Sequence, residues 1–66
     1  MKYKVKYKDS QQRPHVRYYN ALNSNTAKEM FKATVNHSLG NEKVCDIEVL
    51  KLDEEEHKWL PTSIKE

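Results

Sequence analysis

The chain has 66 residues and a net charge of +2, with 36% hydrophobic and 33% charged residues. This length predicts one small domain with a thin core, which we place at residues 1–61. No apolar run is long enough to cross a membrane, no signal-peptide pattern follows Met1, and a single cysteine excludes an internal disulfide. We therefore expect a cytoplasmic protein. The charge is uneven, at +6 over residues 1–40 and −4 over residues 41–66, and the basic part suggests a polyanionic partner.

The segment Lys2–Lys8 alternates lysine with Tyr3, Val5 and Tyr7. Side chains of a strand point alternately to opposite faces, so the alternation predicts a half-buried strand with one apolar and one cationic face. After a polar loop, a second strand is predicted from about residue 15 to residue 21. Val16 and Tyr18 suit one face of this strand, whereas residues 19 and 21 suit the other. We expect either a bulge or one exposed tyrosine there.

Residues 23–26 are a cluster of helix-capping residues, and Thr26 with Glu29 fits a capping box. Gly40 suits the position that follows a helix. Between them, an apolar stripe recurs at helical spacing, formed by Ala27, Met30, Phe31, Thr34 and Val35. This pattern predicts an amphipathic helix over residues 24–39.

A third strand is predicted over residues 44–52, where Cys45, Ile47 and Val49 share one face. Leu50 and Leu52 break this phase, which indicates a bulge near Val49. An acidic turn at residues 53–56 leads to a short fourth strand over residues 57–60, which Pro61 is expected to stop. Residues 62–66 are expected to form a frayed tail.

The order β-β-α-β-(β) predicts an α+β fold, with one antiparallel sheet in the spatial order 2-1-3-4 and a single amphipathic helix on one face. The first strand is central in this arrangement. Lys4 and Lys6 then lie beside Asp46 and Glu48 on the open face of the sheet, where we expect a ladder of opposite charges.

The basic first hairpin is a candidate site for DNA or RNA. Phosphate contacts are expected from Lys4, Lys6, Lys8, Arg13 and Arg17, and stacking or groove contacts from Tyr18 and Tyr19. If the ladder forms, the remaining positive charge lies towards Lys8, Arg13 and Arg17. The alternative is a protein-interaction subunit or homodimer that uses a sheet edge, or Trp59 and Leu60 as an apolar anchor.

The residue pattern does not favour an enzyme, a cofactor or a metal site. Cys45 lies on the apolar phase of its strand, and no two of the cysteine and histidine residues have zinc-ligand spacing. One glycine in the chain excludes a phosphate-binding loop. The carboxylates of residues 53–56 lack the spacing of a calcium loop, so we interpret them as a solvated turn.

Two families share parts of this pattern. Residues 3–32, reading Y-K-V-K-Y-K-D-x-x-x-R and then Y-x-A-x-N-S-x-x-A-x-x-x-F-K, resemble the arm-binding domains of phage and transposon integrases. That resemblance implies a three-stranded sheet placed in a DNA groove, although the usual loop glycine is missing here. Residues 3–52 are similar in layout to the archaeal ribosomal protein LX, whose basic segment before the last strand is replaced by Glu42-Lys43. Both resemblances imply a nucleic-acid partner.

Overall fold

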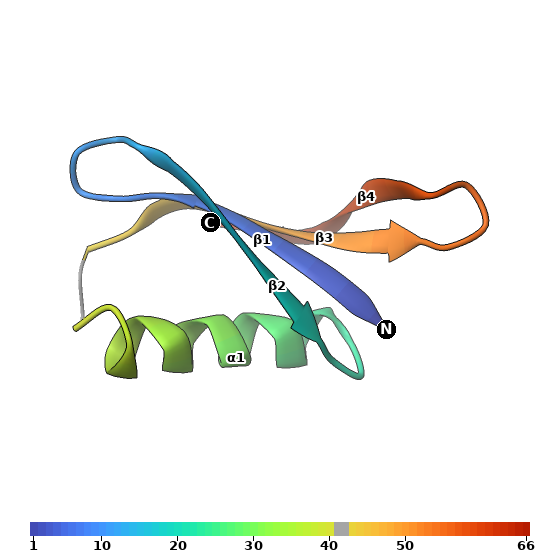
Figure 1. The fold of residues 1–66 in the computed structure, drawn as a ribbon, viewed down its shortest axis with the longest axis horizontal. Coiled ribbons are helices and arrows are strands. Elements are labelled where there is room, and N and C mark those ends of the chain that lie inside the picture. The colour runs from blue at the N-terminus through green and yellow to red at the C-terminus, as the bar shows by residue number, and fades with distance from the viewer. Residues whose placement is uncertain (41–42) are drawn as a thin grey trace.

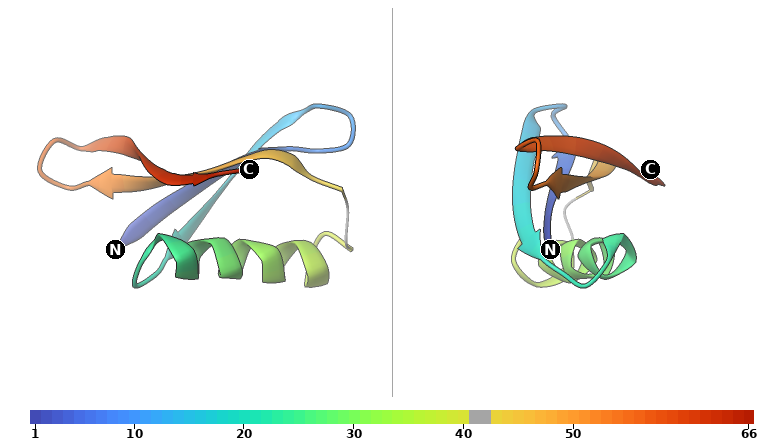
Figure 2. Two further views of the ribbon diagram at one scale, coloured as in Figure 1. Left: turned by 180° about the vertical axis from the view of Figure 1, so that it is seen from behind. Right: turned by 90° about the vertical axis from the view of Figure 1, so that its right-hand side faces the viewer.

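The computed structural model describes residues 1–40 and 43–66. Strands β1 (Lys2–Lys8), β2 (Pro14–Asn20), β3 (Cys45–Asp53) and β4 (Lys58–Lys65) pair antiparallel in the order β2-β1-β3-β4. Helix α1 (Ser24–His37) follows β2 and lies along one face of the sheet (Figure 1). The other face carries no helix, as Figure 2 shows from behind and from the side. The predicted α+β fold and strand order are confirmed.

The core lies between the sheet and α1. Tyr3, Val5 and Tyr7 of β1 are buried there, as the alternation predicts, and they meet Phe31 of the helix and Val49 of β3. Val5, Val49 and Phe31 are almost completely removed from solvent. Burial of each such side chain contributes roughly 1.5–3 kcal/mol, so a few side chains supply most of the hydrophobic stabilisation.

Asn23 begins the helix, because its side-chain Oδ1 accepts a hydrogen bond from the Thr26 N–H at 2.8 Å. Thr26 therefore lies inside the first turn, which corrects the capping box predicted from Thr26 and Glu29. At the other end, the Ser38 N–H donates to the Thr34 carbonyl. Gly40 then takes a positive φ of 61°, a conformation that glycine adopts without a Cβ penalty.

The irregularity of β3 lies at its start. Lys6 opposes Glu48 but Lys8 opposes Cys45, so β3 holds an extra residue there, and Asp46 has a φ of 53°. From Glu48 onward β3 pairs with β1 in regular register. Leu50 is directly opposite Lys4, which places Leu50 on the open face. The leucines are thus apolar residues of the open face, and they do not require a change of phase in β3.

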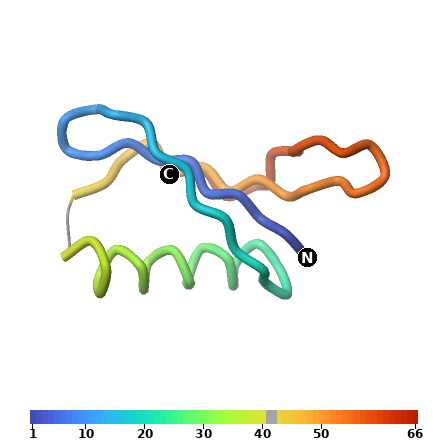
Figure 3. Tube along the Cα trace, in the orientation of Figure 1, coloured from blue at the N-terminus to red at the C-terminus, as the bar shows by residue number. Residues whose placement is uncertain are grey.

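The structure corrects the predicted end of the fourth strand. β4 continues through Pro61 to Lys65, and the Glu66 N–H donates to the Ile47 carbonyl at 2.6 Å. β4 is an edge strand, where a missing proline N–H is tolerated. Opposite Val49, β4 carries extra residues, since Glu48 pairs with Lys65 but Leu50 pairs with Pro61. The chain end consequently lies at the edge of the sheet beside the first residues of β3, far from the β3–β4 turn, as the trace in Figure 3 shows.

Candidate nucleic-acid interface

The register of the sheet determines which side chains share the open face. Lys4 lies between Tyr18 of β2 and Leu50 of β3, and Lys6 lies between Val16 and Glu48. Leu52 is opposite Trp59 of β4. The open face therefore carries lysines, a glutamate, and aromatic and aliphatic residues: Lys2, Lys4, Lys6, Lys8, Val16, Tyr18, Glu48, Leu50, Leu52 and Trp59.

Tyr18 and Trp59 meet across this face although β1 and β3 lie between their strands. Their ring centroids are 5.8 Å apart at an interplanar angle of 47°, and the Lys4 Nζ lies 4.9 Å from the centroid of the Trp59 ring. We call these three residues the aromatic platform. Tyr18 is 67% exposed, so the ambiguity in β2 is resolved by an exposed tyrosine and not by a bulge. Trp59 is half-buried and lies on the side of the sheet opposite the core.

A hollow of about 420 Å³ adjoins the platform at the start of β1. Its lining combines the two platform rings with a cation and an amide, and consists of Lys2, Tyr18, Tyr19, Asn20, Leu52 and Trp59. Flat apolar surfaces with a few polar groups at their margin suit a planar, hydrogen-bonding ligand group such as a nucleobase.

The predicted ladder of opposite charges is reduced to one ion pair in the described part of the chain. The Lys8 Nζ lies 3.5 Å from the Asp46 Oδ2, and both side chains are exposed. Lys6 is opposite Glu48 in register, yet no ion pair joins them. Lys4 is opposite Leu50 and not a carboxylate. The charge of the central lysines is consequently less neutralised than the sequence indicates.

Arg13 is held by the turn of the first hairpin. Asp9 is buried and accepts hydrogen bonds from the Arg13 Nε at 2.9 Å and from the Gln11 and Arg13 backbone N–H groups. The His15 Nε2 also lies 2.9 Å from Asp9. Hydrogen bonding, first by His15 and then by the Arg13 backbone N–H, holds the pKa of Asp9 well below its ordinary value. Asp9 thus offsets cationic charge at the hairpin end, towards which the sequence predicts the remaining positive charge to lie.

Arg17 and Tyr19 face the helix side of the sheet. They are opposite Val5 and Tyr3 in register, and the Tyr19 hydroxyl lies 2.7 Å from the Thr34 Oγ1. Of the predicted nucleic-acid residues, the structure places Lys4, Lys6, Lys8 and Tyr18 on the open face, although Lys8 is paired with Asp46. Arg13 lies in the turn with Asp9, Arg17 lies on the helix side, and Tyr19 contacts Thr34 there while it also lines the hollow beside the platform.

Trp59, which the sequence suggests as a protein anchor, joins Lys4 and Tyr18 on the open face. Leu60 neighbours Trp59 in the chain and is 41% exposed, but it lines a different hollow. Apolar residues at the alternate positions 50 and 52, in phase with Glu48, are the sequence signal for a second apolar face. Their contact with the platform depends on pairing between β1, β3 and β4, which local periodicity does not specify.

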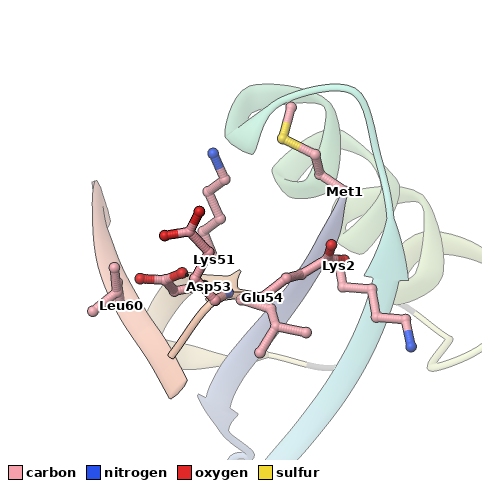
Figure 4. Close-up of a pocket in the computed structure, with 8 residues that line it drawn as sticks. Met1, Lys2, Lys51, Asp53, Glu54 and Leu60 are labelled. Carbon is pink, nitrogen blue, oxygen red and sulfur yellow. Dashed lines mark hydrogen bonds between the residues drawn. The ribbon is translucent and has the colours of Figure 1, made fainter. Parts of the chain in front are cut away.

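Figure 4 shows the hollow near the β3–β4 turn, where Met1 and Lys2 at the start of the chain face residues of the β3–β4 hairpin. Its lining residues are mostly exposed, and the Asp53 carboxylate accepts a hydrogen bond from the Glu55 N–H at 3.0 Å. Asp53 thus stabilises the turn. This open hollow combines three carboxylates with two lysines, and its lining contains no histidine or cysteine.

Residues 1–40 and 43–66 contain no group of three or more histidine, cysteine, aspartate or glutamate side chains that could hold a metal ion. Within the same residues, no helix has the length and apolar character needed to cross a membrane. Cys45 is half-buried, and the Gln12 Nε2 lies 3.7 Å from its sulfur.

The chain matches no known family, and comparisons with curated proteins and with solved structures found no similar protein.

Proposed function

We propose that the protein binds single-stranded nucleic acid across the open face of its sheet. The observation that carries the proposal is the aromatic platform, in which the exposed Tyr18 ring and the Trp59 ring lie beside the Lys4 ammonium group. Bases of a single strand stack on aromatic side chains, and lysines contact the phosphates between them. The same face serves both contacts because β1 supplies lysines at every second residue.

The platform favours single strands over a duplex. Bases in a duplex are stacked on one another and present only their edges in the grooves, so their faces are not available to Tyr18 and Trp59. An unpaired base can instead enter the hollow beside the platform, where Lys2 and Asn20 supply polar contacts at its margin. Stacking contributes about 1–3 kcal/mol per base and depends little on base identity.

The variants Tyr18→Ala and Lys4→Gln test this proposal by fluorescence anisotropy of a labelled single strand of about 15 nucleotides. Loss of the Tyr18 ring is expected to weaken binding about tenfold. Loss of the Lys4 charge is expected to weaken binding. It should also reduce the slope of log affinity against log salt by the amount that corresponds to about one lost phosphate contact. Both residues are at least partly exposed on the sheet surface, so the fold should persist.

Lys32→Gln is the matched control, because Lys32 is an exposed lysine of α1 on the other side of the molecule. It removes the same charge and should leave binding nearly unchanged. Equal weakening by Lys4→Gln and Lys32→Gln would show a response to net charge alone, and an unchanged affinity for Tyr18→Ala would exclude stacking. Either result would contradict the proposed site.

A further inference from the structure

The outer edge of β2 has free backbone hydrogen-bonding groups. The Asp9 N–H donates to the Arg13 carbonyl and the Ala21 N–H donates to the Met1 carbonyl, which shows that odd-numbered residues of this segment bond to β1. Alternate residues of an antiparallel edge strand face away from their partner. The N–H and C=O groups of Val16, Tyr18 and Asn20 therefore point outward, and no backbone hydrogen bond from elsewhere in residues 1–40 and 43–66 reaches them.

The middle of β2 lacks two of the usual protections of an edge strand, proline and a bulge. Natural edges are blocked by proline, charged side chains or a bulge; residues 15–20 contain no proline and pair regularly with β1, and Arg17 is the charged side chain among them. The opposite edge, β4, differs, because it contains Pro61 and an irregular register opposite Val49. β2 is thus the edge of this sheet that can accept another strand.

A cationic groove accompanies this edge on its helix side. It lies between β2 and α1, and its lining includes Tyr7, His15, Arg17, Tyr19 and Thr34. The Nε of Arg17 is buried there without a hydrogen-bond acceptor among the described residues. A buried guanidinium N–H without an acceptor is costly, and a carboxylate is the acceptor that guanidinium binds best.

The helix wall of the groove supplies no carboxylate. Thr34 of α1 contacts Tyr19 of β2, whereas Lys28 of α1 contacts Glu66 beyond β4. Thr34 and Lys28 therefore lie on opposite sides of the helix. At 100° per residue, Met30 and His37 share the Thr34 side. The Asp9 carboxylate contacts His15 of the groove and is already engaged by His15 and Arg13.

We propose that β2 binds an extended acidic peptide segment, which adds as a fifth strand and places a carboxylate on Arg17. A peptide strand satisfies both the N–H and the C=O groups of the edge, whereas a nucleic-acid backbone offers phosphate acceptors but no donors for the carbonyls. A second copy of β2 fits less well, because it would bring a second cationic strand and no carboxylate. The register predicts the peptide pattern: an acidic residue on the helix side, flanked by β-branched residues beside Val16 and Tyr18.

The probe is the peptide acetyl-Thr-Val-Glu-Val-Thr-amide, added at up to about 1 mM to the isotope-labelled protein and followed by NMR. The amides of Val16, Tyr18 and Asn20 should shift and become protected from hydrogen exchange. A Gln-containing control peptide should bind about tenfold more weakly, because the charge-assisted hydrogen bonds to Arg17 are lost. A control peptide N-methylated at both valines should not protect the edge amides.

The variant Arg17→Met should abolish the preference for the Glu peptide over the Gln peptide, and its own spectrum reports whether the fold is retained. Even if that variant unfolds, the comparison of the peptides on the unaltered protein decides the proposal. Equal affinity for the Glu and Gln peptides, or shifts confined to the open face, would overturn it. Protection of the β2 amides by an oligonucleotide, or by raising the protein concentration alone, would assign the edge to nucleic acid or to a second copy and would also overturn it.

Discussion

Lys4 lies in β1 and Asp9 directly follows that strand, but the surroundings of these two residues give their charges different roles. Asp9 is 4% exposed, and its oxygens accept hydrogen bonds from the turn and from Arg13. The negative charge of Asp9 therefore stabilises the turn of the first hairpin. Lys4 instead contacts the Trp59 ring, and no carboxylate pairs with it in the described part of the chain. Its charge remains available on the surface.

The pKa of Asp9 gives a pH dependence of stability whose direction follows from linkage. An unfolded aspartate titrates near 3.8, and the folded protein holds the pKa of Asp9 below that value. The ionised carboxylate therefore stabilises the fold above about pH 4, and this contribution declines as the pH falls towards the lowered pKa. Asp9→Asn should lower the Tm by several degrees at pH 7.

The measurement is thermal unfolding by circular dichroism at pH 7, 4 and 2 for the parent protein and Asp9→Asn. The difference in Tm should shrink as the pH falls below about 4, because the unfolded parent then takes up a proton on Asp9 while the folded protein resists protonation. A difference that stays constant over this range would mean that Asp9 acts through its shape and turn hydrogen bonds and not through its charge.

The elements differ in how far local sequence specifies them. Alternation in residues 2–8 and the helical stripe around Phe31 predict β1 and α1, because each pattern has the period of its own structure. The last strand is longer than predicted, since proline stops only a strand whose N–H is needed by a neighbour. The contact between Tyr18 and Trp59 was not predictable from local pattern, because it needs the register of all four strands.

The sequence predicted only part of the candidate site, because local alternation places side chains on a face but does not give their contacts with other segments. Lys4, Lys6 and Tyr18 share the open face because they follow the alternation of their strands. Arg13 was misplaced because Asp9, which follows β1 directly, forms a turn centred on its own carboxylate. Alternation in β2 alone does not show which of its two tyrosines is exposed.

The continuation of β4 predicts a stabilising contact beyond Pro61. Ile64 is half-buried and packs against the core, whereas its neighbour Ser63 is exposed. Ile64→Ala should lower the free energy of unfolding by about 1–2 kcal/mol, less than for a fully buried isoleucine. Ser63→Ala is the control and should change it by less than about 0.5 kcal/mol. Urea unfolding that shows equal stability for the two variants would indicate that the end of β4 does not contribute to the fold.

The molecule as a whole has two distinct sides. One side of the sheet is closed by α1 over the core, and the other exposes lysines, two leucines and the aromatic platform (Figure 2). The cationic groove beside β2 lies on the helix side, so the acidic residue of a bound peptide would contact Arg17 there, whereas its flanking residues would share Tyr18 with a nucleic acid on the open face. The positive charge of β1 thus lies on the open face, whereas Arg17 of β2 lies on the helix side.

The emission of Trp59 reports most directly on the proposed nucleic-acid interface, because Trp59 is the single tryptophan of the chain and belongs to the platform. The protein would be titrated with a single strand of about 15 nucleotides and with the matching duplex, at about 50 mM and about 200 mM salt. We predict saturable quenching by the single strand that weakens steeply at the higher salt, and weaker quenching by the duplex. An emission that stays unchanged at the lower salt, whether or not the strand binds elsewhere, would contradict the account.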